Sequence, residues 1–277
     1  MAAIAGGAIP GMSYAQGNPA VGLPLWELGI GAGFSYGPDY PAAAQNSLNG
    51  LPFPVIIYRG DIFRTGDGEL IRGQFIDTRR LEFSIGADGA FPADSDENDA
   101  RDGMPDLDYL VELGPRANFY LLPRQRGHEL SVDVQVRGVF STDFTSVGYE
   151  GIVVNPGLLY RNRRLLGSTK VDFSASLGAL WGYDGLNDYF YQVRPRFARD
   201  DRPAFDADNG YIGSELDFRL RYRLTSSLRL LVGLRLGYFD GSANQDSPLH
   251  RENFNVAAGM GLTWSIRQSE EQVGGSR

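Results

Sequence analysis

The sequence predicts an all-β fold: an antiparallel transmembrane β-barrel of about twelve strands, with short periplasmic turns and longer extracellular loops. The first observation is that every second residue is apolar in two consecutive segments, 216–223 and 228–238. Such alternation describes strands with one apolar and one polar face. The second observation is their length, because soluble strands usually stop after about five or six residues and membrane-spanning strands need about ten. The third is that aromatic residues fall at the ends of the predicted strands, where the lipid headgroups lie.

The composition agrees with a barrel and excludes several other classes. The chain has 277 residues, of which 36 are glycine and 12% are aromatic. No run of about eighteen apolar residues offers a transmembrane helix. The net charge of -8 argues against a nucleic-acid partner, and the absence of cysteine excludes disulfides and thiol chemistry. The alternative fold is an aromatic-rich soluble barrel or sandwich.

The chain divides into three segments. Residues 1–23 resemble the remnant of a signal peptide followed by a disordered N-terminus, with Ser13-Tyr14-Ala15 similar to a signal-peptidase site and no basic region before it. A disordered Ala/Gly leader is the alternative. Residues 24–266 form the predicted barrel, and residues 267–277 form a polar C-terminal tail.

The strands follow in order from the alternation and from the turn residues between them. Residues 66–68, Gly-Asp-Gly, are a strong hairpin signal between two weakly patterned strands. The expected strands are 26–36, 54–58, 62–64, 70–76, 81–87, 109–121, 130–140, 152–160, 171–181, 216–222, 228–238 and 254–266.

The connections and the aromatic residues orient the barrel. If short turns are periplasmic, residues 77–79, 123–127, 161–168 and 225–227 lie inside, together with both termini. The long loops 37–52, 91–107, 141–150, 184–210 and 240–251 then lie outside. The aromatic residues form two predicted girdles, an outer one of Tyr36, Trp181, Tyr183, Tyr211 and Tyr238, and an inner one of Trp26, Phe119, Tyr160, Tyr222 and Trp264.

Charged residues occupy the face opposite to the apolar one and are candidates for the barrel lumen. They could line a small selective pore, or they could pair with one another and plug the lumen, since burying them unpaired would cost several kcal/mol each. The candidate lumen charges are Glu112, Arg116, Asp133, Arg137, Asp172, Glu215, Asp217, Arg219, Arg221, Arg229 and Arg235.

The predicted inner turns are basic, whereas the outer loops are mostly acidic. The candidate periplasmic contact residues are Arg124, Arg126, Arg161, Arg163 and Arg164, and Arg79 and Arg80 share their character. Such turns could contact acidic partner proteins, or they could contact anionic lipid of the inner leaflet, which is the simpler account.

Two other features are candidates for chemistry, and each has a simpler reading. The acidic residues between Asp94 and Asp106 offer oxygen ligands for calcium, but they lack the spacing of an EF-hand and read more simply as a solvated loop. His128 and Ser131 could belong to a hydrolase site, but their spacing on a strand is poor for it. We therefore predict no catalytic, metal or cofactor site.

Several motifs, in order, resemble the MipA/OmpV family of outer-membrane proteins. They are residues 25–34 (LWELGIGAGF) with 37–40 (GPDY), 51–55 (LPFPV) with 58–61 (YRGD), 106–108 (DLD) with 112–114 (ELG), and 259–264 (GMGLTW). The likeness covers nearly all of residues 24–266. One departure is that the last strand closes on Ile266, whereas such barrels commonly end on an aromatic residue that aids membrane insertion.

The resemblance implies an outer-membrane location in a Gram-negative-type bacterium, with outer-membrane lipid and lipopolysaccharide around the barrel. It also implies a non-enzymatic scaffold, because the name-giving member binds a lytic transglycosylase and a peptidoglycan synthase. The family offers no catalytic motif to carry over. Two alternatives remain: a narrow porin-like channel, suggested by the charged lumen, and a surface adhesin, suggested by the Tyr- and Asp-rich residues 184–210.

Overall fold

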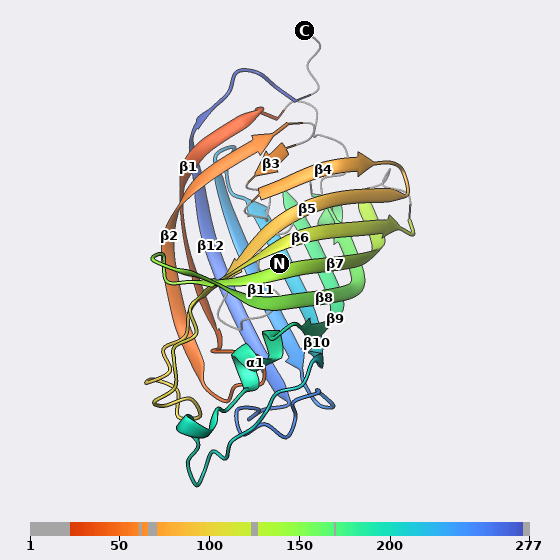
Figure 1. Cartoon of the computed structure of the whole chain (residues 1–277). Coiled ribbons are helices and arrows are strands. Elements are labelled where there is room, and N and C mark those ends of the chain that lie inside the picture. The colour runs from red at the N-terminus through yellow and green to blue at the C-terminus, as the bar shows by residue number, and fades with distance from the viewer. Residues whose placement is uncertain (1–22, 61–62, 66–70, 123–126, 169, 274–277) are drawn as a thin grey trace.

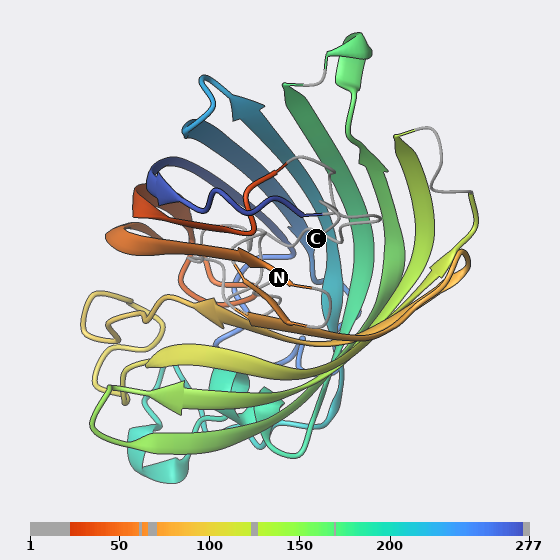
Figure 2. The same cartoon turned by 90° about the horizontal axis from the view of Figure 1, so that it is seen from above.

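The computed structural model describes residues 23–60, 63–65, 71–122, 127–168 and 170–273. Within them, twelve strands pair antiparallel with their neighbours in sequence order and form a closed barrel (Figures 1 and 2). The first strand, β1 (Trp26–Pro38), closes the ring by pairing with the last, β12 (Phe254–Gln268). The predicted leader falls almost wholly outside the described residues, as does the end of the predicted tail. Among the described helices, none has the length and apolar character needed to cross a bilayer.

The remaining strands fill the wall between β1 and β12. They are β2 (Asn46–Arg59), β3 (Phe63–Thr65), β4 (Ile71–Asp77), β5 (Leu81–Ala90), β6 (Tyr109–Tyr120), β7 (His128–Thr142), β8 (Val147–Asn162), β9 (Val171–Tyr183), β10 (Gly210–Arg223) and β11 (Leu228–Tyr238). The helical segments are short: α1 (Leu186–Tyr191), η2 (Leu165–Gly167) and η3 (Pro195–Phe197).

The alternation of the sequence becomes the two faces of the wall. On β1, Ile30 and Phe34 point outward and are 55% and 57% exposed, whereas Glu27 points inward and is buried. This pattern places the apolar side chains against lipid and the polar ones in the lumen. We call the outward, lipid-facing apolar surface the apolar belt. Exposed aromatic rings mark both of its ends, for example Tyr36 and Tyr238 at the outer end and Trp26 and Trp264 at the inner end.

Two of the predicted outer loops are shorter than expected. Residues 46–51 belong to β2, where they pair with Pro38 to Gly33 of β1. A main-chain ladder needs no apolar pattern, so the polar sequence hid this part of the strand. In the same way, β7 and β8 continue to Thr142 and Val147, and the predicted loop 141–150 shrinks to a tight turn.

The Asp143 carboxylate holds that turn together by accepting the main-chain N–H groups of Ser146 and Thr145 at 2.7 and 2.8 Å. These hydrogen bonds lower the pKa of Asp143, because they favour its charged form. Asx turns of this kind are local and specific. They allow the β7–β8 hairpin to extend past the outer end of β9, where the last pair is Ile152 with Tyr183, and to stay level with the outer end of β6.

The other long loops fold over the outer mouth of the barrel, at the lower end in Figure 1. We call this assembly the outer cap: residues 39–45, 91–108, 184–209 and 239–253. It contains an apolar core, with Tyr40, Leu186, Phe190 and Leu249 at 0–1% exposure. The Tyr40 hydroxyl donates to the Leu249 carbonyl at 2.8 Å, which joins the first and last loops.

Candidate functional site: the barrel lumen

The structure brings the predicted lumen charges together on the inner face of β6 to β11. Nine of the eleven side chains are buried, with 0–9% exposure. Asp172 and Arg221 are half-buried and lie opposite each other in the β9–β10 register. Alternation explains the arrangement, since Glu215, Asp217 and Arg219 are every second residue of one strand and share one face.

Most of these charges form ion pairs with charges on neighbouring strands. Arg116 Nε lies 2.5 Å from Asp133 Oδ2, which links β6 to β7. Arg235 Nε of β11 lies 2.9 Å from Asp217 Oδ1 of β10. Buried charges are tolerated when they are paired in this way. The pairs therefore tie adjacent strands together and neutralise the lumen locally.

Two buried carboxylates of β5, Asp88 and Glu82, lie outside the predicted set. Asp88 Oδ2 lies 3.6 Å from Arg137 Nη1, which also contacts Glu112 Oε2 at 3.3 Å. Glu82 accepts a hydrogen bond from the Tyr120 hydroxyl at 2.9 Å. Their parity relative to the apolar Phe83 and Ile85 was the signal that could have found both.

Charged and polar side chains also meet at the junction of the first and last strands, in what we call the seam cluster: Glu27, Arg59, Arg229 and Ser265. Arg229 belongs to the predicted set, whereas Glu27, Arg59 and Ser265 were missed. Glu27 Oε1 lies 2.6 Å from Arg59 Nη2, and Glu27 Oε2 lies 2.6 Å from Arg229 Nη2. The Ser265 hydroxyl donates to the same carboxylate. One side chain of β1 thus connects β2, β11 and β12.

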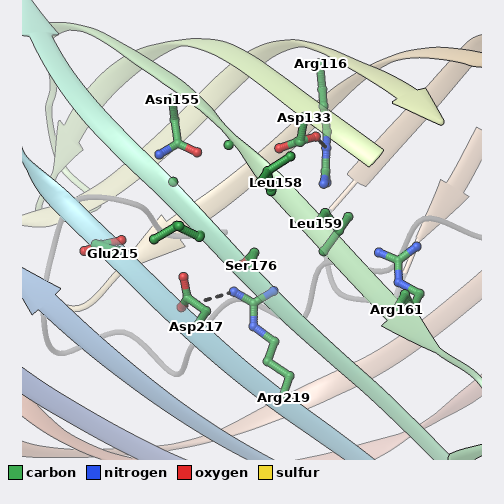
Figure 3. Close-up of a pocket in the computed structure, with 13 residues that line it drawn as sticks. Arg116, Asp133, Asn155, Leu158, Leu159, Arg161, Ser176, Glu215, Asp217 and Arg219 are labelled. Carbon is green, nitrogen blue, oxygen red and sulfur yellow. Dashed lines mark hydrogen bonds and ion pairs between the residues drawn. The ribbon is translucent and has the colours of Figure 1, made fainter. Parts of the chain in front are cut away.

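A pocket in the lumen is lined by many of the predicted charges (Figure 3). Asp133 and Arg116 lie on one side of it, and Glu215, Asp217 and Arg219 on the other. Asn155 donates to the Ala179 carbonyl at 3.1 Å and is thereby engaged with the wall. The acidic and basic groups satisfy one another, so the pocket presents little uncompensated charge to a ligand.

The predicted periplasmic contact residues are placed differently from one another. Arg164 is exposed in the β8–β9 turn, and Arg163 is 29% exposed with Nη2 3.0 Å from Glu129 Oε1. Arg161 points into the barrel, is 2% exposed, and lies 3.4 Å from the other Glu129 oxygen, so it is not presented to a partner. Arg124 and Arg126 lie outside the described residues.

The two other chemical candidates take structural roles. His128 Nδ1 lies 3.0 Å from the Tyr160 hydroxyl at the end of β7. In the acidic loop, Asp106 accepts the Ser95 N–H at 2.8 Å and Asp102 pairs with Arg199 at 2.7 Å. Within the described residues, no group of three or more His, Asp or Glu side chains is arranged to hold a metal ion.

Burial determines the protonation of the tyrosines in the outer cap. Burial raises the pKa of the Tyr40 phenol to about 12, and the nearby Arg101 guanidinium, 5.7 Å from the ring centre, only partly opposes this. Burial also raises the pKa of Tyr191, whose hydroxyl donates to the Pro41 carbonyl at 3.2 Å. Both phenols are neutral and hydrogen-bonded, as buried tyrosines should be.

Comparison with known proteins agrees with this geometry. The family model described as MltA-interacting protein MipA matches residues 30–266. The chain belongs to the MipA family. It is accordingly an outer-membrane β-barrel of Gram-negative bacteria. No protein of known, curated function matches the sequence of this MipA-family chain.

Several solved structures are similar to it. One described as the NanC porin is 8% identical with a TM-score of 0.40, and the match covers 86% of this chain and 100% of that one. The channel DcaP of Acinetobacter baumannii is 9% identical with a TM-score of 0.37, covering 91% and 100%. Outer membrane phospholipase A from Escherichia coli is 11% identical with a TM-score of 0.35, covering 86% and 92%. The number and order of the strands in this protein come from its own strand pairing and not from these similar structures.

Proposed function

We propose that this MipA-family protein is a non-enzymatic, non-conducting scaffold that holds peptidoglycan-remodelling enzymes at the periplasmic face of the outer membrane. The observation that carries the proposal is family membership, because the family is named for interaction with MltA, a murein transglycosylase. A peptidoglycan synthase is the second expected partner. The barrel serves as the anchor, and its periplasmic turns serve as the contact.

The pairing of the lumen charges favours an anchor over a channel. The ion pairs of β5–β7 and β10–β11 join adjacent strands along the inner wall at several levels. The outer cap adds an apolar core over the outer mouth. A solute that bound to these charges would have to break buried pairs, which is strongly destabilising.

The described turns at the periplasmic end carry an exposed cationic set, which we call the basic turn surface: Arg79, Arg80, Arg164 and Lys170. All four are exposed and come from two different turns, β4–β5 and β8–β9. Exposed cationic side chains at one end of the barrel attract an acidic partner surface and speed association. The basic turn surface is therefore the proposed site of enzyme contact.

The proposal is tested by capture of a purified periplasmic lytic transglycosylase on the full-length barrel in detergent. We expect the triple variant Arg79→Glu, Arg80→Glu and Arg164→Glu to lose most of the captured enzyme, because the charge of the contact is reversed. The matched control reverses two exposed arginines of the outer cap, Arg194→Glu and Arg196→Glu, and should capture as the parent does. Capture no better than that of an unrelated barrel of similar size would refute the scaffold.

The channel alternative is tested in planar bilayers. If the paired charges of the inner wall offer no path to a solute, the protein should give no conductance steps of stable size. Stable steps from the parent protein would contradict the anchor and support a narrow pore lined by Asp217, Arg219 and Arg235.

A further inference from the structure

In the part of the chain that the structure describes, most of the edge of β2 that faces β3 has no strand partner. Among the described residues, the β2–β3 ladder consists of Tyr58 with Thr65 and Arg59 with Arg64. On its other edge, β2 pairs continuously with β1 from Asn46 to Tyr58. We call the β3-facing side of residues 46–55 the open edge. A barrel normally abolishes such edges, so this one needs an explanation.

Two prolines, Pro52 and Pro54, remove donors from the open edge. The Thr65 hydroxyl donates to the Ile56 carbonyl at 2.9 Å, so the main-chain groups of Ile56 point toward β3. The Arg59 N–H donates to the Leu25 carbonyl on the β1 side. Main-chain groups alternate between the two edges of a strand, so the nitrogens of both prolines face the open edge.

Two other prolines within strands, Pro115 and Pro156, also lie where main-chain pairing is absent. Pro115 of β6 falls where the β6–β7 ladder is interrupted, between Leu113 and Arg116. Pro156 of β8 falls where the β8–β9 ladder is interrupted. Those breaks span two residues each, whereas the open edge spans most of a strand. The prolines of β2 thus disfavour pairing of this edge with another strand, because they lack the N–H donors that pairing requires.

The open edge lies within the apolar belt. Pro52 and Pro54 sit opposite Ala32 and Ile30 of β1, between the girdle residues Tyr36 and Trp26. The outward neighbours are strongly exposed apolar side chains, with Leu48 at 72% and Ile56 at 56%. The lipid-facing surface therefore continues up to the open edge.

Behind the open edge, the inner face of β2 is apolar. We call Leu51, Phe53, Val55 and Ile57 the apolar strip. Phe53 lies over Gly31 of β1, where a Cβ would come within 2.5 Å of the ring, so the glycine makes room for it. Leu51 faces inward by alternation and yet is 43% exposed, which shows that this part of the lumen is accessible.

The ends of the open edge are fixed. At the outer end, Gln45 Nε2 donates to the Glu97 carbonyl at 2.9 Å, and Asn98 donates to Asp39 at 2.6 Å. At the inner end, β3 pairs with β2. The opening is thus framed by the outer cap and by β3, at the depth of the hydrocarbon.

We propose that the open edge is a lateral port through which an acyl chain of an outer-membrane lipid enters and lies along the apolar strip. The occupant is apolar because the port faces hydrocarbon and its lining carries no charge between Leu51 and Ile57. It is not a polypeptide strand, because the prolines remove the donors that strand addition requires. The strip is continuous with the apolar belt, so a chain reaches it without crossing water.

The test is photo-cross-linking from a benzophenone side chain at single phenylalanine positions of the full-length protein in phosphatidylethanolamine–phosphatidylglycerol vesicles. Phe53 is the test site. Phe34 is the lipid-facing reference, at 57% exposed, and Phe239 is the buried reference in the outer cap, at 3%. Intact-protein mass reports the addition of one lipid, and heat-modifiable gel migration confirms that each variant is folded.

We expect lipid addition at Phe53 within about threefold of Phe34 and about tenfold above Phe239, since benzophenone reacts only with C–H bonds in contact. Addition at the level of Phe239, or cross-links from Phe53 only to the chain itself, would overturn the port. If the Phe53 variant does not fold, benzophenone placed at Leu51 tests the same strip by the same criteria. Neither result depends on enzyme binding at the periplasmic turns.

Discussion

The two sides of the lumen differ in the side chains that point into it. From β5 to β11 the inward positions carry buried carboxylates and guanidiniums that contact one another across adjacent strands. Apart from Glu27 of the seam cluster, the buried inward positions of β12, β1 and the outer part of β2 carry uncharged side chains, mostly glycine, alanine, small hydroxyl-bearing or apolar residues. Charges need partners at fixed distances, which requires a continuous wall. Small and apolar side chains need none, and this is where the wall has an open edge.

Charged side chains of both sides contact one another at the seam cluster, so its carboxylate gives the largest expected effect. Replacing Glu27→Gln leaves Arg59 and Arg229 without their shared negative charge. Breaking a buried pair costs about 3–5 kcal/mol. We expect a loss of unfolding free energy of that size, measured by urea titration in vesicles with tryptophan fluorescence.

The matched control is Glu270→Gln, an exposed carboxyl of the C-terminal segment, which should change stability by less than about 0.5 kcal/mol. Equal stability of both variants would mean that the two sides of the lumen are held together by something other than the seam cluster.

The second prediction restores donors to the open edge. The double variant Pro52→Val and Pro54→Val returns two main-chain N–H groups to that edge, and exposed strand edges pair with one another. We expect dimers or higher oligomers on size-exclusion chromatography with light scattering. Pro115→Val is the matched control, because its strand has β5 and β7 on its two sides and should leave the protein monomeric. A monomeric double variant would show that the edge is not available for pairing.

The smallest expected effect concerns the outer cap, which closes the mouth above both sides. The Tyr40 phenol has its pKa raised from 10.0 to about 12 by burial, so the folded state favours the neutral form. Its contribution to stability is complete below pH 10 and is lost as the pH rises toward 12. We expect the cap loops to become protease-sensitive over that window, while phenolate absorbance at 295 nm lags behind that of free tyrosine.

The variant Tyr40→Phe removes both the hydrogen bond of the Tyr40 hydroxyl and its ionisation. It removes the hydrogen bond to the Leu249 carbonyl, which is worth about 1 kcal/mol. It should also make the alkaline loss of the cap shallower, with Tyr191 responsible for part of what remains. An unchanged alkaline profile would assign the loss to other groups.

Period-two patterning was sufficient to predict the barrel and its apolar face, because both depend on alternation alone. It could not predict the pairing of the inward charges, since Arg137 contacts Glu112 and Asp88 on two other strands. Nor could it find the outer part of β2, where Asn46 to Leu51 are held by the main chain of β1. Glu27 was invisible as a hub because its partners come from both ends of the sequence.

The seam cluster also sets an order of assembly. Glu27 meets Arg59 after 32 residues, Arg229 after 202 and Ser265 after 238. A growing chain can therefore pair the first carboxylate oxygen within its first hairpin, and the second only when the last two strands arrive. A barrel stopped short of β11 would leave the Glu27 Oε2 atom without Arg229 and Ser265 at the junction that must still seal. Completion of the chain and pairing of that oxygen are the same event.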